Sequence, residues 1–279
     1  MIQLGLIGYP LGHSLSPEIH GAAFKACDLQ GKYSLFPIPP DDSRGLKDLL
    51  ARVRDGEITG LNITIPHKEN VIPLLDALSS TARSIGAVNT IFMQNEVLMG
   101  DNTDAPGFLA DLHRFFEGNQ LSTTKMKSAL VLGAGGSARA VVYALAQDGW
   151  NIAIAARRSE KAQELITQIS DPSSRIAPVD FTSLNSLAPA LIVNTTPVGM
   201  SPDVNSSPWP ADLPLPSTAA IYDLVYNPRK TKLVKNALAS GLFATTGLGM
   251  LVEQAALSFE TWTGLKVPRG PLFSTLEAL

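Results

Sequence analysis

This chain of 279 residues has one cysteine, a net charge of only −3 and no long apolar run. The single cysteine, Cys27, excludes an internal disulfide and favours a reducing compartment. Cys27 lies in the apolar helical pattern "AAFKACDL", so we expect it in the core. The small net charge gives no long-range attraction to nucleic acid or anionic membranes. No stretch approaches the roughly 18 apolar residues of a membrane span. The first residues, "MIQLGLIGYP", lack the basic segment of a signal peptide, and these absences together predict a cytoplasmic protein.

Short apolar runs alternate with helical patterns in the first part of the chain, which indicates an α/β fold with a parallel sheet. Ser16 and Pro17 predict the start of the first helix, with Ser16 as N-cap and Pro17 at the first helical position. Asn95-Glu96 predicts the turn of a hairpin within 89–100. The expected strands are 2–8, 33–38 and 59–65, and the expected helices are 16–27, 43–56 and 103–116.

The alternation starts again after the polar segment 117–128, which lacks periodicity and predicts a linker. Residues 197–218 are rich in proline and serine and predict a loop, and a loop of that length is often functional. The C-terminal segment 247–264 predicts an amphipathic helix that could join either half. We therefore expect two α/β domains. The expected elements here are strands at 129–132, 151–156, 191–196 and 219–226 and helices at 137–149 and 159–169.

The segment "VLGAGGSARA" places Gly133, Gly135 and Gly136 at a strand-to-helix turn, with Ala138 at the third fingerprint position. Glycine permits the tight turn and lets a pyrophosphate approach the backbone, while the helix N-terminus offers free N–H groups. Because the turn follows an apolar strand and opens a helix, it predicts dinucleotide binding rather than a merely structural turn.

The next strand ends in "AARRSEKA", where an NAD site usually carries an acidic residue. Arg157 and Arg158 stand there instead, and guanidinium groups suit a 2′-phosphate. The alternative is a solvated, charged helix start, but cations oppose the dipole at that end of a helix. The pattern favours NADP over NAD.

Eight motifs in order, "GYPLGHSLSPEIH", "NITIPHK", "GAVNT", "GDNTD", "GAGGSARA", "NTTPVGM", "YDLVYNP" and "GMLVEQAALSFETWTG", closely resemble the shikimate/quinate dehydrogenase family. The resemblance implies NADPH-dependent, reversible reduction of 3-dehydroshikimate to shikimate in aromatic amino-acid biosynthesis. It implies two α/β domains with the active-site cleft between them. These are a mostly parallel substrate domain, 1–103 plus 243–279, and a Rossmann-type NADP-binding domain, 104–242. The chain departs from the family pattern at Gly21, which follows His20 where asparagine is common. It departs again at Ala156 and Arg158, which flank Arg157 where asparagine and threonine are usual.

The resemblance also implies the site residues. The catalytic pair falls on Lys68 and Asp104. The substrate-binding residues fall on Ser14, Ser16, Thr64, Lys68, Asn89, Asp104, Tyr226 and Gln254, with Asn62 close by. The cofactor-binding residues fall on Gly133, Ala134, Gly135, Gly136, Ser137, Ala138, Arg157, Gly247 and Met250, to which the residue argument adds Arg158.

The residues themselves support part of this assignment. Lys68 follows a strand end, the edge at which α/β proteins bind ligands, and a protonated lysine there can stabilise a developing oxyanion and donate a proton. Asp104 could orient that lysine. Sequence alone also allows Lys68 to be an ordinary surface cation and Asp104 to be a helix N-cap. Ser14 and Ser16 would face one side of an extended backbone and could bind a carboxylate. Gln254, among core positions of its helix, needs polar partners.

Three functions stay open at this point: a shikimate dehydrogenase, a quinate/shikimate dehydrogenase using NAD or NADP, and a nicotinamide-binding sensor without turnover. The histidines at 13, 20 and 67 lack metal-ligand spacing, and we expect no metal. We expect a small-molecule substrate and no nucleic-acid or membrane partner, in a monomer or a homodimer.

Overall fold

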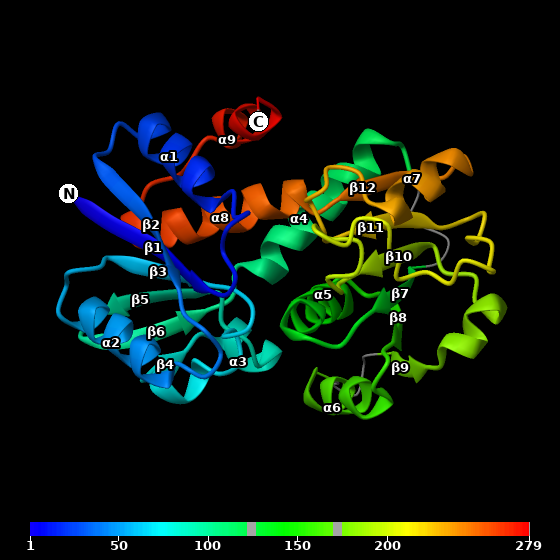
Figure 1. Cartoon of the computed structure of the whole chain (residues 1–279), viewed down its shortest axis with the longest axis horizontal. Coiled ribbons are helices and arrows are strands. Elements are labelled where there is room, and N and C mark those ends of the chain that lie inside the picture. The colour runs from blue at the N-terminus through cyan, green and yellow to red at the C-terminus, as the bar shows by residue number, and fades with distance from the viewer. Residues whose placement is uncertain (122–126, 170–174, 279) are drawn as a thin grey trace. The chain divides into compact units, whose positions relative to one another are not determined.

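The structure is a computed structural model of the chain, and it describes residues 1–121, 127–169 and 175–278. The chain divides into two compact units, each with its own sheet: Met1–Gly107 with Val252–Leu279, and Phe108–Leu251 (Figure 1). The expectation of a two-domain α/β protein is confirmed. Residues 122–126 of the expected linker lie outside the described residues.

The first unit contains a mixed six-stranded sheet in the order β2-β1-β3-β5-β6-β4. β1 pairs in parallel with β2 and β3, whereas β5 pairs antiparallel with β3 and β6. The expected hairpin is present, with Asn95 and Glu96 at positive φ between β5 and β6. The strands are β1 (Ile2–Gly8), β2 (Gly31–Pro37), β3 (Gly60–Ile63), β4 (Ala77–Leu78), β5 (Thr90–Gln94) and β6 (Val97–Asp101).

Helices cover both faces of this sheet. The alternating side chains of β3 show which residues face which helix. Leu61 and Ile63 pack into the apolar cluster built by α2. Gly60 and Asn62 point the other way, because side chains alternate along a strand, and both meet α8. α1 contacts α9, as Figure 1 shows. The helices of this unit are α1 (Ser16–Ala26), α2 (Ser43–Arg54), η1 (Ile72–Leu74), α3 (Ser80–Ile85), α9 (Arg269–Glu277), the start of α4 (Asp104–Gly118) and most of α8 (Leu248–Thr263).

The second unit contains a fully parallel six-stranded sheet in the order β12-β11-β10-β7-β8-β9. Counted from β7, this is the 3-2-1-4-5-6 order of the Rossmann fold. Ligands of such sheets bind at the carboxyl ends of the strands, at the point where the strand order reverses, which here lies between β7 and β10. Its elements are β7 (Ser128–Leu132), α5 (Gly136–Gln147), β8 (Asn151–Ala155), α6 (Ser159–Ile169), β9 (Ile176–Val179), η2 (Phe181–Ser186), β10 (Leu191–Asn194), β11 (Ala220–Asp223), α7 (Lys232–Ala239) and β12 (Ala244–Thr246).

Most of the strands and helices expected from periodicity are present within a few residues, and 197–218 contains neither a helix nor a strand. The strand expected at 59–65 is shorter, because β3 ends at Ile63. Sequence patterns missed β4, α3, β9, α7, β12 and α9, most of which are too short to show a period.

Two local predictions are wrong. Ser16 is the first residue of α1 rather than its N-cap, and no side chain caps this helix. Cys27 is only partly buried, because α1 ends at Ala26 and its thiol lies against the carbonyl of Lys266 instead of entering the core.

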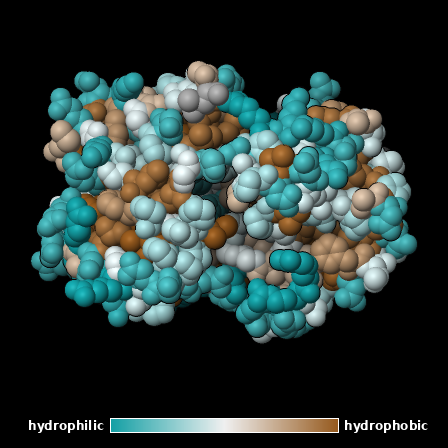
Figure 2. Space-filling view, viewed as in Figure 1, coloured by the Kyte–Doolittle hydropathy of each residue, from teal (hydrophilic) through white to brown (hydrophobic). Residues whose placement is uncertain are grey.

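None of the helices within the described residues is long and apolar enough to cross a membrane. On the face drawn in Figure 2, apolar residues are interspersed with hydrophilic ones over each unit. The exposed large apolar side chains, such as Leu35, Ile65 and Phe243, come from separate segments of the chain.

Candidate active site

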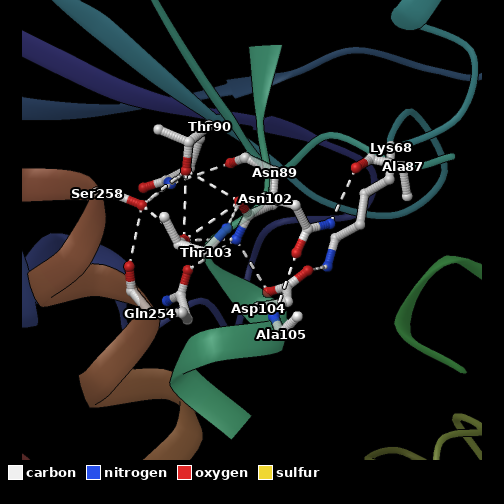
Figure 3. A network of polar contacts seen from close by, with 11 residues as sticks. Lys68, Ala87, Asn89, Thr90, Asn102, Thr103, Asp104, Ala105, Gln254 and Ser258 are labelled. Carbon is white, nitrogen blue, oxygen red and sulfur yellow. Dashed lines mark hydrogen bonds and ion pairs between the residues drawn. The ribbon is translucent and has the colours of Figure 1, made fainter. Parts of the chain in front are cut away.

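Lys68 and Asp104 form a close ion pair in the first unit, although 36 residues separate them along the chain. The Lys68 Nζ lies 2.7 Å from Asp104 Oδ2, and the two side chains are only 12% and 6% exposed. Figure 3 shows this pair at one end of a connected polar network. A surface lysine would be far more exposed, so Lys68 is not an ordinary surface cation.

The turn after β3 fixes the position of Lys68 at both sides. The Thr64 N–H donates to the Ile7 carbonyl at 2.8 Å, which continues the pairing with β1 one residue beyond the strand. The Lys68 carbonyl accepts from the Val88 N–H at 2.8 Å. The buried ring of His67 lies between these anchors, with Nε2 2.7 Å from the Ile38 carbonyl. The lysine therefore emerges from a well-anchored backbone.

Asp104 opens helix α4, but it is not the residue that caps the helix. Asn102 does this, because its Oδ1 accepts from the Ala105 N–H at 3.2 Å. The N-cap alternative for Asp104 is therefore wrong. Its carboxylate bonds Lys68 through Oδ2 and accepts from Asn89 Nδ2 at 2.9 Å through Oδ1.

The amide of Asn89 has a fixed orientation. Its Oδ1 accepts from the backbone N–H of Thr103 at 2.8 Å, and a backbone N–H can only donate. The Nδ2 group must then face the Asp104 carboxylate, and it also lies 3.3 Å from Gln254 Oε1. Asn89 thus presents a hydrogen-bond donor to the Asp104 carboxylate.

Four of the predicted site residues therefore belong to one network, namely Lys68, Asp104, Asn89 and Gln254. Gln254 is half-buried on α8, and its Oε1 accepts from the Asn89 amide, so the expected polar partner exists.

Sequence reasoning missed the hydroxyl cluster beneath this network, and it named Asn62 only as a neighbour. Ser258 Oγ on α8 lies 2.7 Å from Thr90 Oγ1 and 3.0 Å from Thr103 Oγ1. Asn62 Nδ2 donates to the same Ser258 oxygen at 3.0 Å. All four side chains are buried. Ser258 carried no motif signal, but its place one helical turn after Gln254 puts both residues on one face of α8.

The region around Ser14 and Ser16 differs from the prediction. Leu15 has φ −90° and ψ 3°, so the backbone is not extended and the argument from alternation does not hold. The Ser14 Oγ instead accepts from the Ser16 N–H at 3.3 Å. Ser14 and Thr64 are half-buried, and Ser16 is buried.

A buried aromatic stack supports the same region. The ring of Tyr33 stacks on that of His20 at 4.2 Å, and its hydroxyl donates to Asn62 Oδ1 at 2.8 Å. Burial lowers the pKa of His20 to about 3 and raises the pKa of Tyr33. Both side chains are therefore neutral across the physiological range, and Asn62 receives a permanent donor.

The second unit carries the predicted glycine turn between β7 and α5. Gly133 has φ 114°, and a Cβ there would meet Thr195 Oγ1 at 2.6 Å, so glycine is required. Gly135 occupies the N-cap position of α5 without a side-chain cap, and a Cβ there would meet nothing within 4 Å. Open space and an uncapped helix N-terminus fit a pyrophosphate. The remaining residues of the turn, Ala134, Gly136, Ser137 and Ala138, lead directly into α5.

Arg157 and Arg158 follow β8 and are exposed, at the strand edge where an adenosine ribose is expected. A cavity of about 440 Å³ opens beside them. It is lined by Ala156, Ser159, Glu160, Ala162, Gln163, Pro178, Val179 and Asp180. The exposed guanidinium groups therefore fit the 2′-phosphate of a phosphorylated dinucleotide.

A buried carboxylate organises the carboxyl ends of β10 and β11. Asp223 accepts from Asn194 Nδ2 at 2.8 Å, from Thr231 Oγ1 at 2.6 Å and from the Val225 N–H at 3.1 Å. Burial raises its pKa to about 6. The predicted Tyr226 lies in the segment that these bonds hold, in the second unit, and burial also raises its pKa.

Within the described part of the chain, no group of three or more His, Cys, Asp or Glu side chains could hold a metal ion.

Comparisons with known proteins show which family this chain resembles. Residues 6–91 match the shikimate dehydrogenase substrate binding domain, 117–196 match the shikimate/quinate 5-dehydrogenase family and 247–272 match the shikimate 5′-dehydrogenase C-terminal domain. The chain is 40% identical over 280 residues to the shikimate dehydrogenase (NADP(+)) of Salinibacter ruber, covering 98% of this chain and 96% of that one.

Solved structures extend the likeness to the fold. The shikimate 5-dehydrogenase of Thermus thermophilus, in complex with NADP(H) and shikimate, has a TM-score of 0.85 at 36% identity, covering 100% of both chains. The ligand-free 5-ketofructose reductase of a Gluconobacter species has a TM-score of 0.83 at 29% identity, covering 99% of this chain and 98% of that one. The chain thus belongs to the shikimate dehydrogenase family.

Proposed function

We propose that this protein is an NADP-dependent shikimate dehydrogenase, an oxidoreductase that acts on a CH–OH group. It interconverts shikimate and 3-dehydroshikimate, a step of aromatic amino-acid biosynthesis. The observation that carries the proposal is the largely buried Lys68–Asp104 pair, with Asn89 on the second oxygen of the carboxylate. The chain's relatives are named for the same activity.

In the reducing direction, a ketone, NADPH and one proton give an alcohol and NADP⁺. NADPH supplies the hydride that reaches the carbonyl carbon. The Lys68 ammonium donates a hydrogen bond to the ketone oxygen, stabilises the charge that develops there, and then transfers its proton to that oxygen. Asp104 orients the lysine through an ion pair of 2.7 Å.

We propose that polar side chains of the first unit bind the substrate, and Tyr226 is a further candidate substrate-binding residue. We propose that the half-buried amide of Gln254 and the amide of Asn89 bind ring hydroxyls. Ser14 and Ser16 bind the carboxylate, and Thr64 lines the same pocket.

We propose that the second unit binds NADP. The turn from Gly133 to Ala138 binds the pyrophosphate on the N-terminus of α5. Arg157 and Arg158 bind the 2′-phosphate, and Gly247 and Met250 lie at the nicotinamide. The open space at Gly135 and the exposed guanidinium groups support this assignment.

A quinate/shikimate dehydrogenase is the second candidate, because the family matched by residues 117–196 includes quinate enzymes. One assay separates the candidates: the protein is mixed with shikimate or quinate and with NADP or NAD, and nicotinamide absorbance is followed. We expect the nicotinamide to be reduced fastest when shikimate and NADP are supplied together. Faster turnover of quinate would establish the second candidate. Binding of NADPH without turnover of either substrate would indicate a sensor and refute the enzyme. A cytoplasmic location and a monomeric or dimeric state remain predictions, and sedimentation analysis tests the latter.

A further inference from the structure

A buried tyrosine and a buried aspartate of the second unit have no role in the chemistry proposed above. Tyr222 lies on β11 and is fully buried, and its hydroxyl donates to Asp111 Oδ2 on α4. Asp111 is 6% exposed, and Arg114, less than one turn further along α4, donates to its other oxygen. Burial, and then the charge of Asp111, raise the pKa of Tyr222 well above its usual value, so the phenol keeps its proton and donates.

This pair supports the turn that leads into α8. A Cβ at Gly249 would overlap the carboxylate of Asp111, and a Cβ at Gly247 would overlap the carbonyl of Leu224, directly after β11. The turn therefore lies against the pair and the end of β11 without a side chain between them.

The charges in this contact favour one position of the turn. The N-terminus of a helix carries a partial positive charge, and the carboxylate of Asp111 lies at the first turn of α8. The hydroxyl of Tyr222 donates to that carboxylate and holds it in this position. Displacement of residues 247–250 would separate the carboxylate from the N-terminus of α8 and lose this favourable interaction.

We infer that Tyr222 and Asp111 are positioning residues for the nicotinamide end of the cofactor, because they fix the backbone of residues 247–250. The inference rests on the proposed NADP site, in which Gly247 and Met250 contact the nicotinamide. Hydride transfer is sensitive to such placement, since a shift of about 1 Å can cost about 10²-fold in rate.

Tyr222→Phe tests this inference, because it removes one oxygen and keeps the ring. Binding of NADPH and of 2′-phospho-ADP-ribose, which lacks the nicotinamide, is measured by calorimetry. We expect NADPH to bind about 3- to 10-fold more weakly and the fragment to bind as it does to the wild type, in line with the loss of one buried hydrogen bond. Tyr143→Phe, on α5 of the same unit, is the matched control and should leave the affinities for NADPH and for the fragment unchanged.

A merely structural role predicts a different result. If Tyr222→Phe weakens both ligands equally, or neither, the inference is overturned. In turnover, kcat should fall and the isotope effect with NADPH deuterated at the transferred C4 position should rise, while the KM for shikimate stays within about twofold. Should Tyr222→Phe not fold, Asp111→Asn must show the same separation of the two ligands. Because the binding test needs no turnover, it stands even where the wild type fails to oxidise shikimate, which would refute the proposed activity alone.

Discussion

Replacement of Lys68 by alanine tests the proposed mechanism most directly. The Lys68 side chain is 12% exposed and its Nζ lies 2.7 Å from Asp104 Oδ2. Alanine at this position removes the ammonium group from the ion pair. Loss of one acid-base group costs about 10²- to 10⁴-fold in kcat. This corresponds to about 3–5 kcal/mol of activation free energy. We expect NADPH binding to be unchanged, because the proposed cofactor contacts belong to the second unit.

The same change also affects stability, and the assay must separate the two effects. Removal of one partner from a buried ion pair destabilises by up to about 3–5 kcal/mol. Asp104 keeps its bond from Asn89, so we expect a smaller loss. kcat is therefore measured at saturating shikimate and NADP, at a temperature where circular dichroism shows the variant folded.

Lys266→Ala is the matched control, because its ammonium is 96% exposed in the same unit and pairs with Glu260 at 3.7 Å. Exposed pairs contribute about 0–1 kcal/mol, so this variant should retain full activity and stability. Turnover of folded Lys68→Ala within about threefold of the wild type would remove Lys68 from the mechanism, since even the smallest expected effect is about 10²-fold.

Three further changes probe other parts of the molecule. Arg157→Ala should weaken NADPH binding more than NADH binding in fluorescence titrations, and equal losses for both would refute a phosphate contact. Asp223→Asn should flatten the pH dependence of stability. The pKa of Asp223 is raised to about 6, so its contribution is complete below about pH 4 and lost as the pH rises through 6, by up to roughly 3 kcal/mol. Thermal melts of both proteins from pH 4 to 7 measure the difference, and parallel curves would contradict it. Gly107→Ala places a Cβ 2.8 Å from the Gln254 backbone nitrogen and should destabilise by about 1–3 kcal/mol. Gly270→Ala is the control and should not destabilise the protein, because its added Cβ would meet nothing within 4 Å. Equal melting temperatures of the two variants would show that α4 and α8 can adjust.

The Rossmann unit could be predicted well from sequence because each of its signals is local. An apolar strand, a glycine turn and a helix follow one another within 129–147, and the parallel order of the strands follows from such alternation. The first unit was harder, since β4 has two residues and α3 six, both too short for periodicity.

The site was predictable only in part, for a physical reason. The order of the motifs named Lys68, Asp104, Asn89 and Gln254, and the structure links all four. The assignment of Ser16 as N-cap failed because the helix begins at Ser16 itself, with Leu15 at the N-cap position, and sequence patterns do not fix a helix start to a single residue.

Ser258 shows most clearly what a linear reading misses. It lies 168 residues from Thr90 along the chain, yet the two hydroxyl oxygens are 2.7 Å apart. The contact exists because Gly60 leaves room for the Trp262 ring, which lets α8 approach β3 and brings Ser258 over Asn62. A small residue on one strand thus lets Gln254 of a distant helix reach the amide of Asn89, which in turn donates to Asp104. The surroundings of the Asp104 carboxylate therefore depend on how closely α8 approaches this sheet, and not only on the motif that contains Asp104.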